Sequence, residues 1–220
     1  MPLISRMTEK TGRFTALLLA MVVDLVMAPF LLTTPAGVTG SRALTTLVLV
    51  VALVAVRASA ATLVLFGVAV IGHVSESIWG GAALQMTAAF LRLVFLSYVF
   101  SLIVRSVLSE RDVSYDTIAG AACAYVLLGL VWGEAFIVAE LWRPGTFDIP
   151  ASFVTGPDGD MRGALIYFSY VTLTTVGYGD IHPGRPGLGA LVITEAIMGQ
   201  LFLAITVARL VGLHTARPKE

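Results

Sequence analysis

The chain has 220 residues, of which 57% are hydrophobic and 13% charged, and its formal net charge is zero. Its mean hydropathy is +0.90. Soluble domains carry about 25% charged and about 45–50% apolar residues, so this composition favours a membrane protein. The neutral charge balance argues against a nucleic-acid partner. A single cysteine, Cys123, and three scattered histidines give no support to a disulfide or a metal cluster.

The first apolar segment covers residues 14–32 and is interrupted only by Asp24. About 20 apolar residues are needed to cross a hydrocarbon core of about 30 Å, so this segment fits a membrane span. A signal peptide is the alternative, because basic residues precede the segment. Its length, the presence of Asp24 and the lack of an A-x-A cleavage site argue against that alternative.

The next apolar stretch, residues 43–74, is too long for one crossing. As a single helix at about 1.5 Å per residue it would measure about 48 Å. We therefore predict a tight hairpin of two short spans with Arg57 near its turn. Further spans are predicted at about residues 82–108, 117–142 and 187–213. Between the last two lies a short apolar run, residues 164–174, which cannot cross the membrane and fits a re-entrant helix.

Six spans with an amino terminus inside place most of the basic loop residues on the inner side, in agreement with the positive-inside bias. The inner residues are then Arg6, Lys10, Arg13, Arg57, Arg105, Arg111, Arg217 and Lys219, and the outer ones are Arg42, Arg143, Arg162 and Arg185. Both termini are therefore expected in the cytoplasm. A single span over residues 43–74 would reverse the side from which the re-entrant segment enters.

The segment after the short apolar run reads TTVGYGD, from Thr174 to Asp180. Gly177 and Gly179 alternate with larger residues, and glycine readily adopts positive φ. Such a strand can point successive carbonyl oxygens to one side, where, with the hydroxyl of Thr175, they can replace the water shell of a monovalent cation. The carboxyl end of the re-entrant helix, negative through its dipole, would favour a cation at the same place. Irregular backbone at membrane depth is tolerated in a pore lining, where water or protein satisfies it.

This segment resembles the selectivity filter of the potassium-channel family, which has the same five residues, Thr175, Val176, Gly177, Tyr178 and Gly179. Residues 167–174, YFSYVTLT, resemble the family's pore helix. Asp180 matches the acidic residue that follows the filter, and Gly199 falls where the family often has a hinge glycine. The resemblance covers roughly residues 113–213. The four earlier spans resemble the voltage-sensor position only in count and order.

The resemblance implies an all-α integral membrane subunit with six transmembrane helices and one re-entrant pore loop, in a homotetramer around one axis. It implies passive potassium conduction in the cell membrane, with K⁺ bound at Thr175, Val176, Gly177 and Tyr178, no other cofactor and no catalysis. Residues 1–112 would form a four-helix membrane domain and residues 113–220 the pore domain. A transporter with a broken-helix substrate site is the alternative; an internal repeat would favour it, and none is evident.

The resemblance also implies supporting residues around the filter. These are Thr174, Asp180, Phe168, Tyr167 and Glu140. The ring of Tyr178 would pack against Phe168 and Tyr167. Glu140 would brace the segment after the filter, with Glu134 as the competing candidate.

Several polar positions keep two interpretations. Asp24 could pair with Arg92, or each could face a water crevice. Glu195 could bond the pore helix from behind or face a cavity. Gly199 could be a hinge or a packing glycine, since small residues let membrane helices approach closely.

Two expectations concern gating. Arg92 is the only arginine on its helical stripe in the fourth span, so we expect weak voltage gating or none. The few residues after Leu213 leave no room for a ligand-binding domain of typical size, so gating by such a domain on this chain is not expected.

Overall fold

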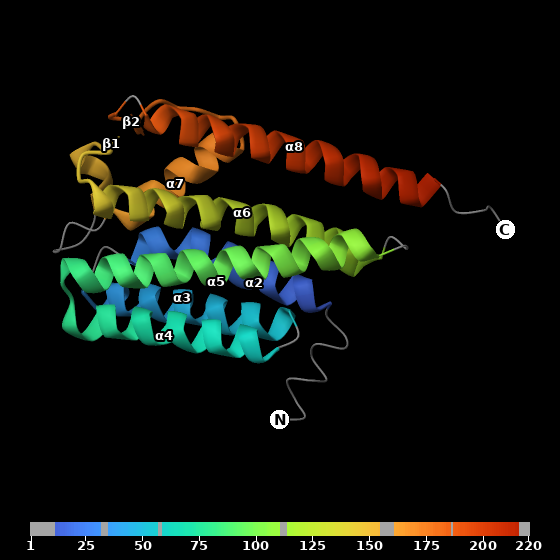
Figure 1. The fold of residues 1–220 in the computed structure, drawn as a ribbon, viewed down its shortest axis with the longest axis horizontal. Helices are drawn as coiled ribbons and strands as arrows, with labels where there is room; N and C mark the ends of the chain where they lie inside the picture. Colours follow the sequence, from blue (N-terminus) through green and yellow to red (C-terminus); the bar gives the residue numbers. More distant parts are fainter. Residues whose placement is uncertain are drawn as a thin grey trace.

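The computed structural model describes residues 12–31, 35–56, 59–110, 114–154, 161–185 and 187–215. Helices dominate this part of the chain, and two short strands form one antiparallel pair (Figure 1). In chain order the elements are α2 (Arg13–Leu31), α3 (Pro35–Ala55), α4 (Ala60–Trp79), α5 (Ala82–Ser109), α6 (Tyr115–Trp142), β1 (Phe147–Asp148), the 3₁₀ helix η1 (Ala151–Phe153), α7 (Arg162–Leu173), β2 (His182–Pro183) and α8 (Leu188–Thr215).

Local sequence signals set several helix boundaries. Ser59 caps α4: its hydroxyl accepts a hydrogen bond from the backbone N–H of Thr62 at 3.2 Å, and the Thr62 hydroxyl accepts one from the Ser59 backbone. Ser114 caps α6 in the same way. Gly80 and Gly81 have φ values of 64° and 95°, which only glycine adopts without strain. These two residues end α4 and reverse the chain into α5.

The predicted hairpin over residues 43–74 is confirmed as two helices, because α3 ends at Ala55 and α4 begins at Ala60. Arg57, expected near its turn, lies outside the described residues. The helices predicted at residues 82–108, 117–142, 164–174 and 187–213 correspond to α5, α6, α7 and α8, with boundaries that differ by only a few residues.

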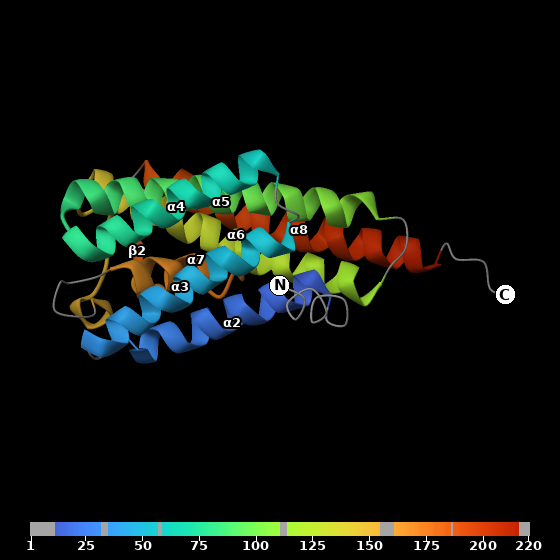
Figure 2. The ribbon, with the colours of Figure 1, turned by 90° about the horizontal axis from the view of Figure 1, so that it is seen from below.

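Helix α6 occupies the middle of the molecule (Figures 1 and 2). Helices α5 and α2 pack on one side of it, and α7 and α8 lie on the other. Helices α3 and α4 form the layer beyond α2 and α5. This order places α8, the last long helix, at the opposite edge from α3 and α4 (Figure 1).

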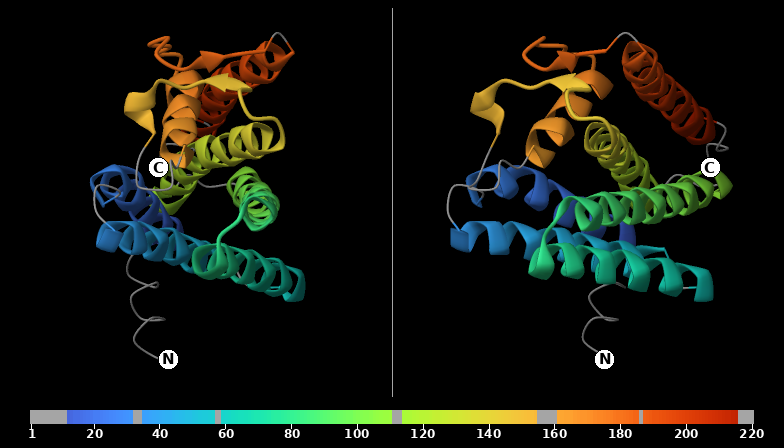
Figure 3. Two further views of the ribbon diagram at one scale, coloured as in Figure 1. Left: turned by 90° about the vertical axis from the view of Figure 1, so that its left-hand side faces the viewer. Right: turned by 60° about the vertical axis from the view of Figure 1, so that its left-hand side comes forward.

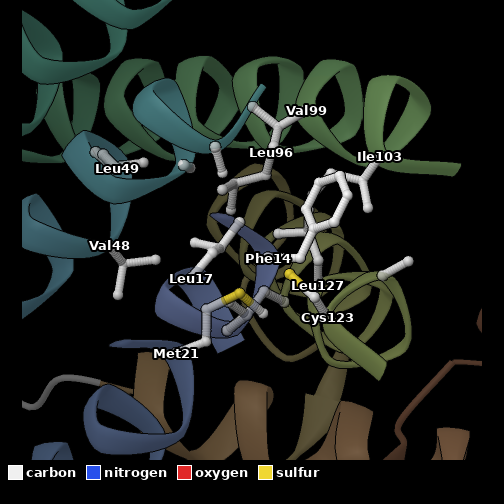
Figure 4. Close-up of a cluster of buried hydrophobic side chains, with 14 of the residues drawn as sticks. Phe14, Leu17, Met21, Val48, Leu49, Leu96, Val99, Ile103, Cys123 and Leu127 are labelled. Atoms are coloured by element: carbon white, nitrogen blue, oxygen red, sulfur yellow. The ribbon is translucent and has the colours of Figure 1, made fainter. Parts of the chain in front are cut away.

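One buried cluster joins the helices on both sides of the predicted domain boundary at residues 112 and 113 (Figure 4). Leu17 and Met21 of α2 lie with Leu49 of α3, Val99 of α5 and Leu127 of α6, and all five are almost wholly buried. Between membrane helices, close packing of this kind is a main source of association energy. The first four helices and α6 therefore share one core.

A second cluster surrounds the start of α7 and the end of α6. The rings of Phe136, Phe147 and Phe168 lie within 5.2–5.4 Å of one another, centroid to centroid. Its buried part also contains Ala89, Ile137, Ala164, Leu165 and Ile181. Figure 3 shows the β1–β2 pair over α7 at this end of the molecule.

Four helices in the described part of the chain are long and apolar enough to cross a membrane, namely α4, α5, α6 and α8. Residues Gly40–Ala55 of α3 form a shorter apolar helix. Large apolar side chains on α4 and α8 are exposed, for example Ile71, Ile78, Ile197 and Leu201. Such faces need lipid or another protein surface to cover them. The protein is therefore an all-α membrane protein, and the count of six spans stays a prediction.

Candidate functional site

The short helix α7 is fastened to α6 along its length. Its 12 residues extend over about 18 Å, too short to cross a membrane. The Ser169 hydroxyl donates to the carbonyl of Gly129 at 2.7 Å, and the Tyr170 hydroxyl donates to the carbonyl of Val126 at 2.7 Å. A side chain at Gly129 would overlap the Tyr170 ring, so this glycine lets the two helices touch. The position of α7 is therefore set by α6.

The chain turns back on α7 immediately after Leu173. The Thr174 hydroxyl donates to the carbonyl of Tyr170 at 2.6 Å. The backbone N–H groups of Val176 and Gly177 both donate to the carbonyl of Val171, at 3.0 and 3.2 Å. The backbone donors of this segment thus point toward the carboxyl end of α7.

Every second residue of this segment has positive φ. The values are 60° for Thr175, 56° for Gly177 and 76° for Gly179, while Val176 and Tyr178 do not share this conformation. Alternation between conformations of opposite hand turns successive N–H groups to one side of a strand. The N–H groups of Val176 and Gly177 face α7, and we infer from the alternating φ values that the carbonyl oxygens of the segment face away from it. Thr175 carries a side chain at positive φ, which costs about 1–3 kcal/mol and is typical of functional sites.

We call residues 174–179, which have no regular secondary structure, the strand after α7; they are exposed over their whole length in the single chain. Val176 and Tyr178 are 51% and 71% exposed, unusual for large apolar and aromatic residues. It follows the carboxyl end of α7, where the helix dipole is negative. The exposed carbonyl row and the dipole both favour a cation on this side.

Asp180 is fixed directly after the strand. Its Oδ2 accepts a hydrogen bond from the Tyr167 hydroxyl at 2.6 Å, and its Oδ1 accepts one from the N–H of Ile181 at 2.9 Å. The Tyr167 ring stacks on Phe153 of η1 at a centroid distance of 5.3 Å. The first turns of α7 are therefore tied to the segment that leaves the strand.

Glu140 lies at the end of α6 and bonds the loop that follows its own helix. Its carboxylate accepts from the N–H of Gly145 at 2.8 Å and of Phe147 at 2.9 Å. Phe147 belongs to β1, which pairs with β2 at Pro183. Glu140 thus contacts the segment after the filter only indirectly. It bonds β1, and β1 pairs with β2, whereas a direct contact with that segment was expected.

The suggested pair between Asp24 and Arg92 is wrong. Arg92 is completely buried, and its guanidinium donates to Glu76 at 2.7 Å and to Glu134 at 3.1 Å. Glu134, the competing candidate for a filter brace, is thereby committed to Arg92 and to Arg162 of α7. In the described part of the chain, Oδ1 of Asp24 is buried without a hydrogen-bond partner. Similar depth in the membrane did not place Asp24 and Arg92 on facing helix surfaces.

Glu195 of α8 bonds α7 from behind, the first of its two interpretations. It is completely buried, and its Oε1 lies 2.5 Å from Oγ of Ser169. The single Ser169 proton can serve either this oxygen or the carbonyl of Gly129. Ser169 is therefore shared between α6 and α8 and holds three helices together.

Gly199 lies where α8 crosses the end of α7. A Cβ atom there would stand 2.6 Å from the carbonyl oxygen of Leu173 and 2.8 Å from its Cδ1. This close approach agrees with the packing interpretation. Its role as a hinge stays a prediction, since α8 is one continuous helix over Leu188–Thr215.

The packing of the Tyr178 ring against Phe168 and Tyr167 stays a prediction, because the structure describes a single subunit. Phe168 pairs with Phe136 and Phe147, and Tyr167 pairs with Phe153, so among the described residues neither ring pairs with Tyr178. Phe168 is buried in its own chain, whereas Tyr167 is partly exposed and its hydroxyl bonds Asp180 beside the strand.

Sequence reasoning missed the contacts that Ser169, Tyr170 and Tyr125 make with backbone carbonyls. The Tyr125 hydroxyl donates to the carbonyl of Leu173 at 3.2 Å. Sequence reasoning also gave no role to Glu76, although a carboxylate beside an apolar span is a signal of function. The spacing of these four polar residues in the sequence does not indicate which helix each side chain would face.

Residues 125–215, from the middle of α6 to the end of α8, match a protein-family model described as "Ion channel". This match contains the whole α7–strand–α8 unit and gives no support to the transporter alternative. No curated protein and no solved structure matches the chain. The protein is thus an all-α membrane protein whose carboxyl-terminal part is similar to an ion-channel domain, and that domain supports passive ion conduction.

Proposed function

We propose that the chain is one subunit of a homotetrameric potassium channel that conducts K⁺ passively and selectively. The observation that carries the proposal is the strand after α7. Positive φ at Thr175, Gly177 and Gly179, with the N–H groups of Val176 and Gly177 bound to the carbonyl of Val171, supports a row of carbonyl oxygens on the side away from α7. Rings of backbone carbonyls that replace the hydration shell are the basis of potassium selectivity.

A fourfold assembly follows from the single strand per chain. One row of carbonyls covers one side of an ion, so several chains must face a common axis to surround it. The exposed strand and the exposed apolar faces of α8 are the surfaces that such an assembly would bury. K⁺ would then be held by carbonyls of Thr175, Val176, Gly177 and Tyr178, with the Thr175 hydroxyl at the inner end.

Orientation follows from the helix order. We infer six spans in the cell membrane, with both termini in the cytoplasm and the α6–α7 connection outside. Trp79 and Trp142 support this arrangement: both are 72% exposed, and they end α4 and α6. Tryptophan at such positions is typical of the membrane interface.

The test compares two glycine variants in liposomes with opposed K⁺ and Na⁺ gradients. Gly177→Ala places a Cβ at φ 56° in the filter, whereas Gly80→Ala places one at φ 64° between α4 and α5. Neither Cβ would lie within 4 Å of an atom beyond its chain neighbours, so the cost of both variants is backbone strain. That strain is at least as large at Gly80, whose φ of 64° and ψ of −166° favour glycine alone.

We expect the wild type and Gly80→Ala to pass K⁺ and Rb⁺ far better than Na⁺, with block by Ba²⁺. Gly177→Ala should lose conduction, because relief of the strain turns its carbonyl away from the row. Equal permeability to Na⁺ and K⁺ in the wild-type protein would refute the proposal.

A further inference from the structure

Four charged side chains from four helices form a closed ring inside the bundle. Their contacts alternate in sign: Arg92 meets Glu76 at 2.7 Å and Glu134 at 3.1 Å, and Arg162 meets Glu134 at 2.7 Å and Glu76 at 4.0 Å. We call Glu76, Arg92, Glu134 and Arg162 the charge ring. Figure 1 shows that the α4–α5 turn and the end of α6 lie at the same end of the molecule, which brings these residues together.

His73 of α4 extends the charge ring to α3. Its Nδ1 lies 3.2 Å from Nη1 of Arg92, and its Nε2 lies 3.2 Å from the carbonyl oxygen of Arg42. A guanidinium only donates, so Nδ1 accepts and Nε2 carries the proton of a neutral imidazole. The charge ring therefore contains two positive and two negative groups and no further charge from His73.

Stability alone gives a poor reason for this arrangement. Buried ion pairs are often no better than well-packed apolar side chains, because desolvation offsets their attraction. The side chains of Arg92 and Glu134 are only 1% and 5% exposed. Ionisable groups inside membrane proteins are rare and usually functional.

The location of Arg162 indicates what the charge ring does. Arg162 is the first residue of α7, where the helix dipole is positive and disfavours a cation. Glu134 offsets this repulsion, and Arg92 fixes Glu134 through the same Oε1 atom that receives Arg162. The amino end of α7 is thus held by α6 and, through Arg92 and Glu76, by α5 and α4.

We propose that the charge ring positions α7, so that Arg92 and Glu76 take part in setting ion selectivity. The inference rests on the proposed function of the strand after α7. Both residues lie outside residues 125–215, the part that matches an ion-channel domain. They act through Glu134 and Arg162 and are positioning residues, since neither lies on the strand itself.

Treating α7 as a rigid lever gives the shift of its carboxyl end that follows from a shift of its amino end. Ser169, bonded to both α6 and α8, is the natural pivot of α7. At about 1.5 Å per residue, Arg162 lies about 10 Å from Ser169 and Leu173 about 6 Å from it on the other side. A shift of about 1 Å at Arg162 then moves Leu173 by about 0.6 Å, beyond the roughly 0.5 Å tolerance of a binding site.

The decisive variant is the double substitution Arg92→Met with Glu76→Gln. It removes one charge of each sign and leaves the Glu134–Arg162 pair neutral, but it cuts the tie between α7 and helices α4 and α5. Arg105→Met is the matched control, because Arg105 lies on α5 and is exposed. Each full-length variant is reconstituted, its oligomeric state is measured, and the Na⁺/K⁺ permeability ratio is taken from the reversal potential.

We expect the double variant to assemble and its Na⁺/K⁺ permeability ratio to rise at least tenfold, with Arg105→Met unchanged. An assembled double variant with the wild-type ratio would overturn the inference, since charge balance alone would then be sufficient. If the double variant does not assemble, Glu76→Gln decides: a severalfold rise supports the inference and an unchanged ratio overturns it. A wild-type protein that does not select K⁺ would contradict the proposed function itself, a separate outcome.

Discussion

Replacing Gly199 with alanine separates the two interpretations of this residue. The added Cβ would stand 2.6 Å from the carbonyl oxygen of Leu173, a backbone atom that also accepts the Tyr125 hydroxyl. Because the nearest atom belongs to the backbone, a change of side-chain rotamer cannot remove this overlap. Helix α8 or the end of α7 must therefore shift by roughly half an ångström, because protein interiors are close-packed.

The loss of stability caused by Gly199→Ala can be estimated by comparison with a matched variant on the same helix. Gly212 lies on the same helix, and a Cβ there would have nothing within 4 Å in the chain. Both changes gain about 1 kcal/mol of helix propensity, so that gain cancels in the difference. Overpacking at Gly199 costs about 1–3 kcal/mol. We expect Gly199→Ala to be less stable than Gly212→Ala by this amount.

Thermal unfolding of the reconstituted protein, with single-channel recording, tests this prediction. A difference of about 1–3 kcal/mol corresponds to a lower Tm by roughly 2–12 °C for a chain of this size. Because Leu173 directly precedes the filter segment, we also expect weaker selectivity in Gly199→Ala. The packing interpretation is refuted if the two variants are equally stable and Gly199→Ala changes only open probability, as a hinge would.

Three further predictions concern the same region. Ser169→Ala leaves a buried carboxylate on α8 without its donor and should lower stability by about 1–3 kcal/mol in thermal unfolding, whereas Thr194→Ala, exposed on α8, should not. Tyr167→Phe removes the hydrogen bond to Asp180 but keeps the ring, so current should decline faster during sustained opening, as macroscopic recordings would measure. Open probability in planar bilayers should vary only weakly with voltage, with an effective charge below about 6 per tetramer, because Arg92 is fixed.

The sequence predicts the helices well because their signals are local. Runs of apolar residues, charged interruptions and the Gly80–Gly81 pair bound most helices within a few residues of their position in the structure, except that α3 begins at Pro35 and not at residue 43. The filter segment was identified by its resemblance to the potassium-channel family, and Gly177 and Gly179 permit the positive φ that they have in the structure. The positive φ of Thr175 was not anticipated, because a threonine does not favour it.

The partners of polar side chains could not be predicted in this way. Three carboxylates, those of Asp24, Glu76 and Glu134, lie at a membrane depth similar to that expected for Arg92. Which of them pairs with Arg92 depends on how the helices face each other. Side-chain direction along a helix, rather than spacing in the sequence, decides which residues meet. Tyr178 was assigned to Phe168 and Tyr167 from the resemblance, and a resemblance does not state which contacts join different subunits.

The charge ring gives a physical reason to expect that α5 is a poor voltage sensor. A sensor helix must slide, and a shift of one turn, about 5.4 Å, would separate Arg92 from both carboxylates. Breaking a buried ion pair by losing one partner costs about 3–5 kcal/mol. One charge that crosses the whole field gains only about 2.3 kcal/mol per 100 mV. The core that α5 shares with α2, α3 and α6 adds to this cost, so ordinary membrane potentials are too small to move the helix. A steep voltage dependence of opening in the wild-type channel would therefore contradict the fixed position of Arg92.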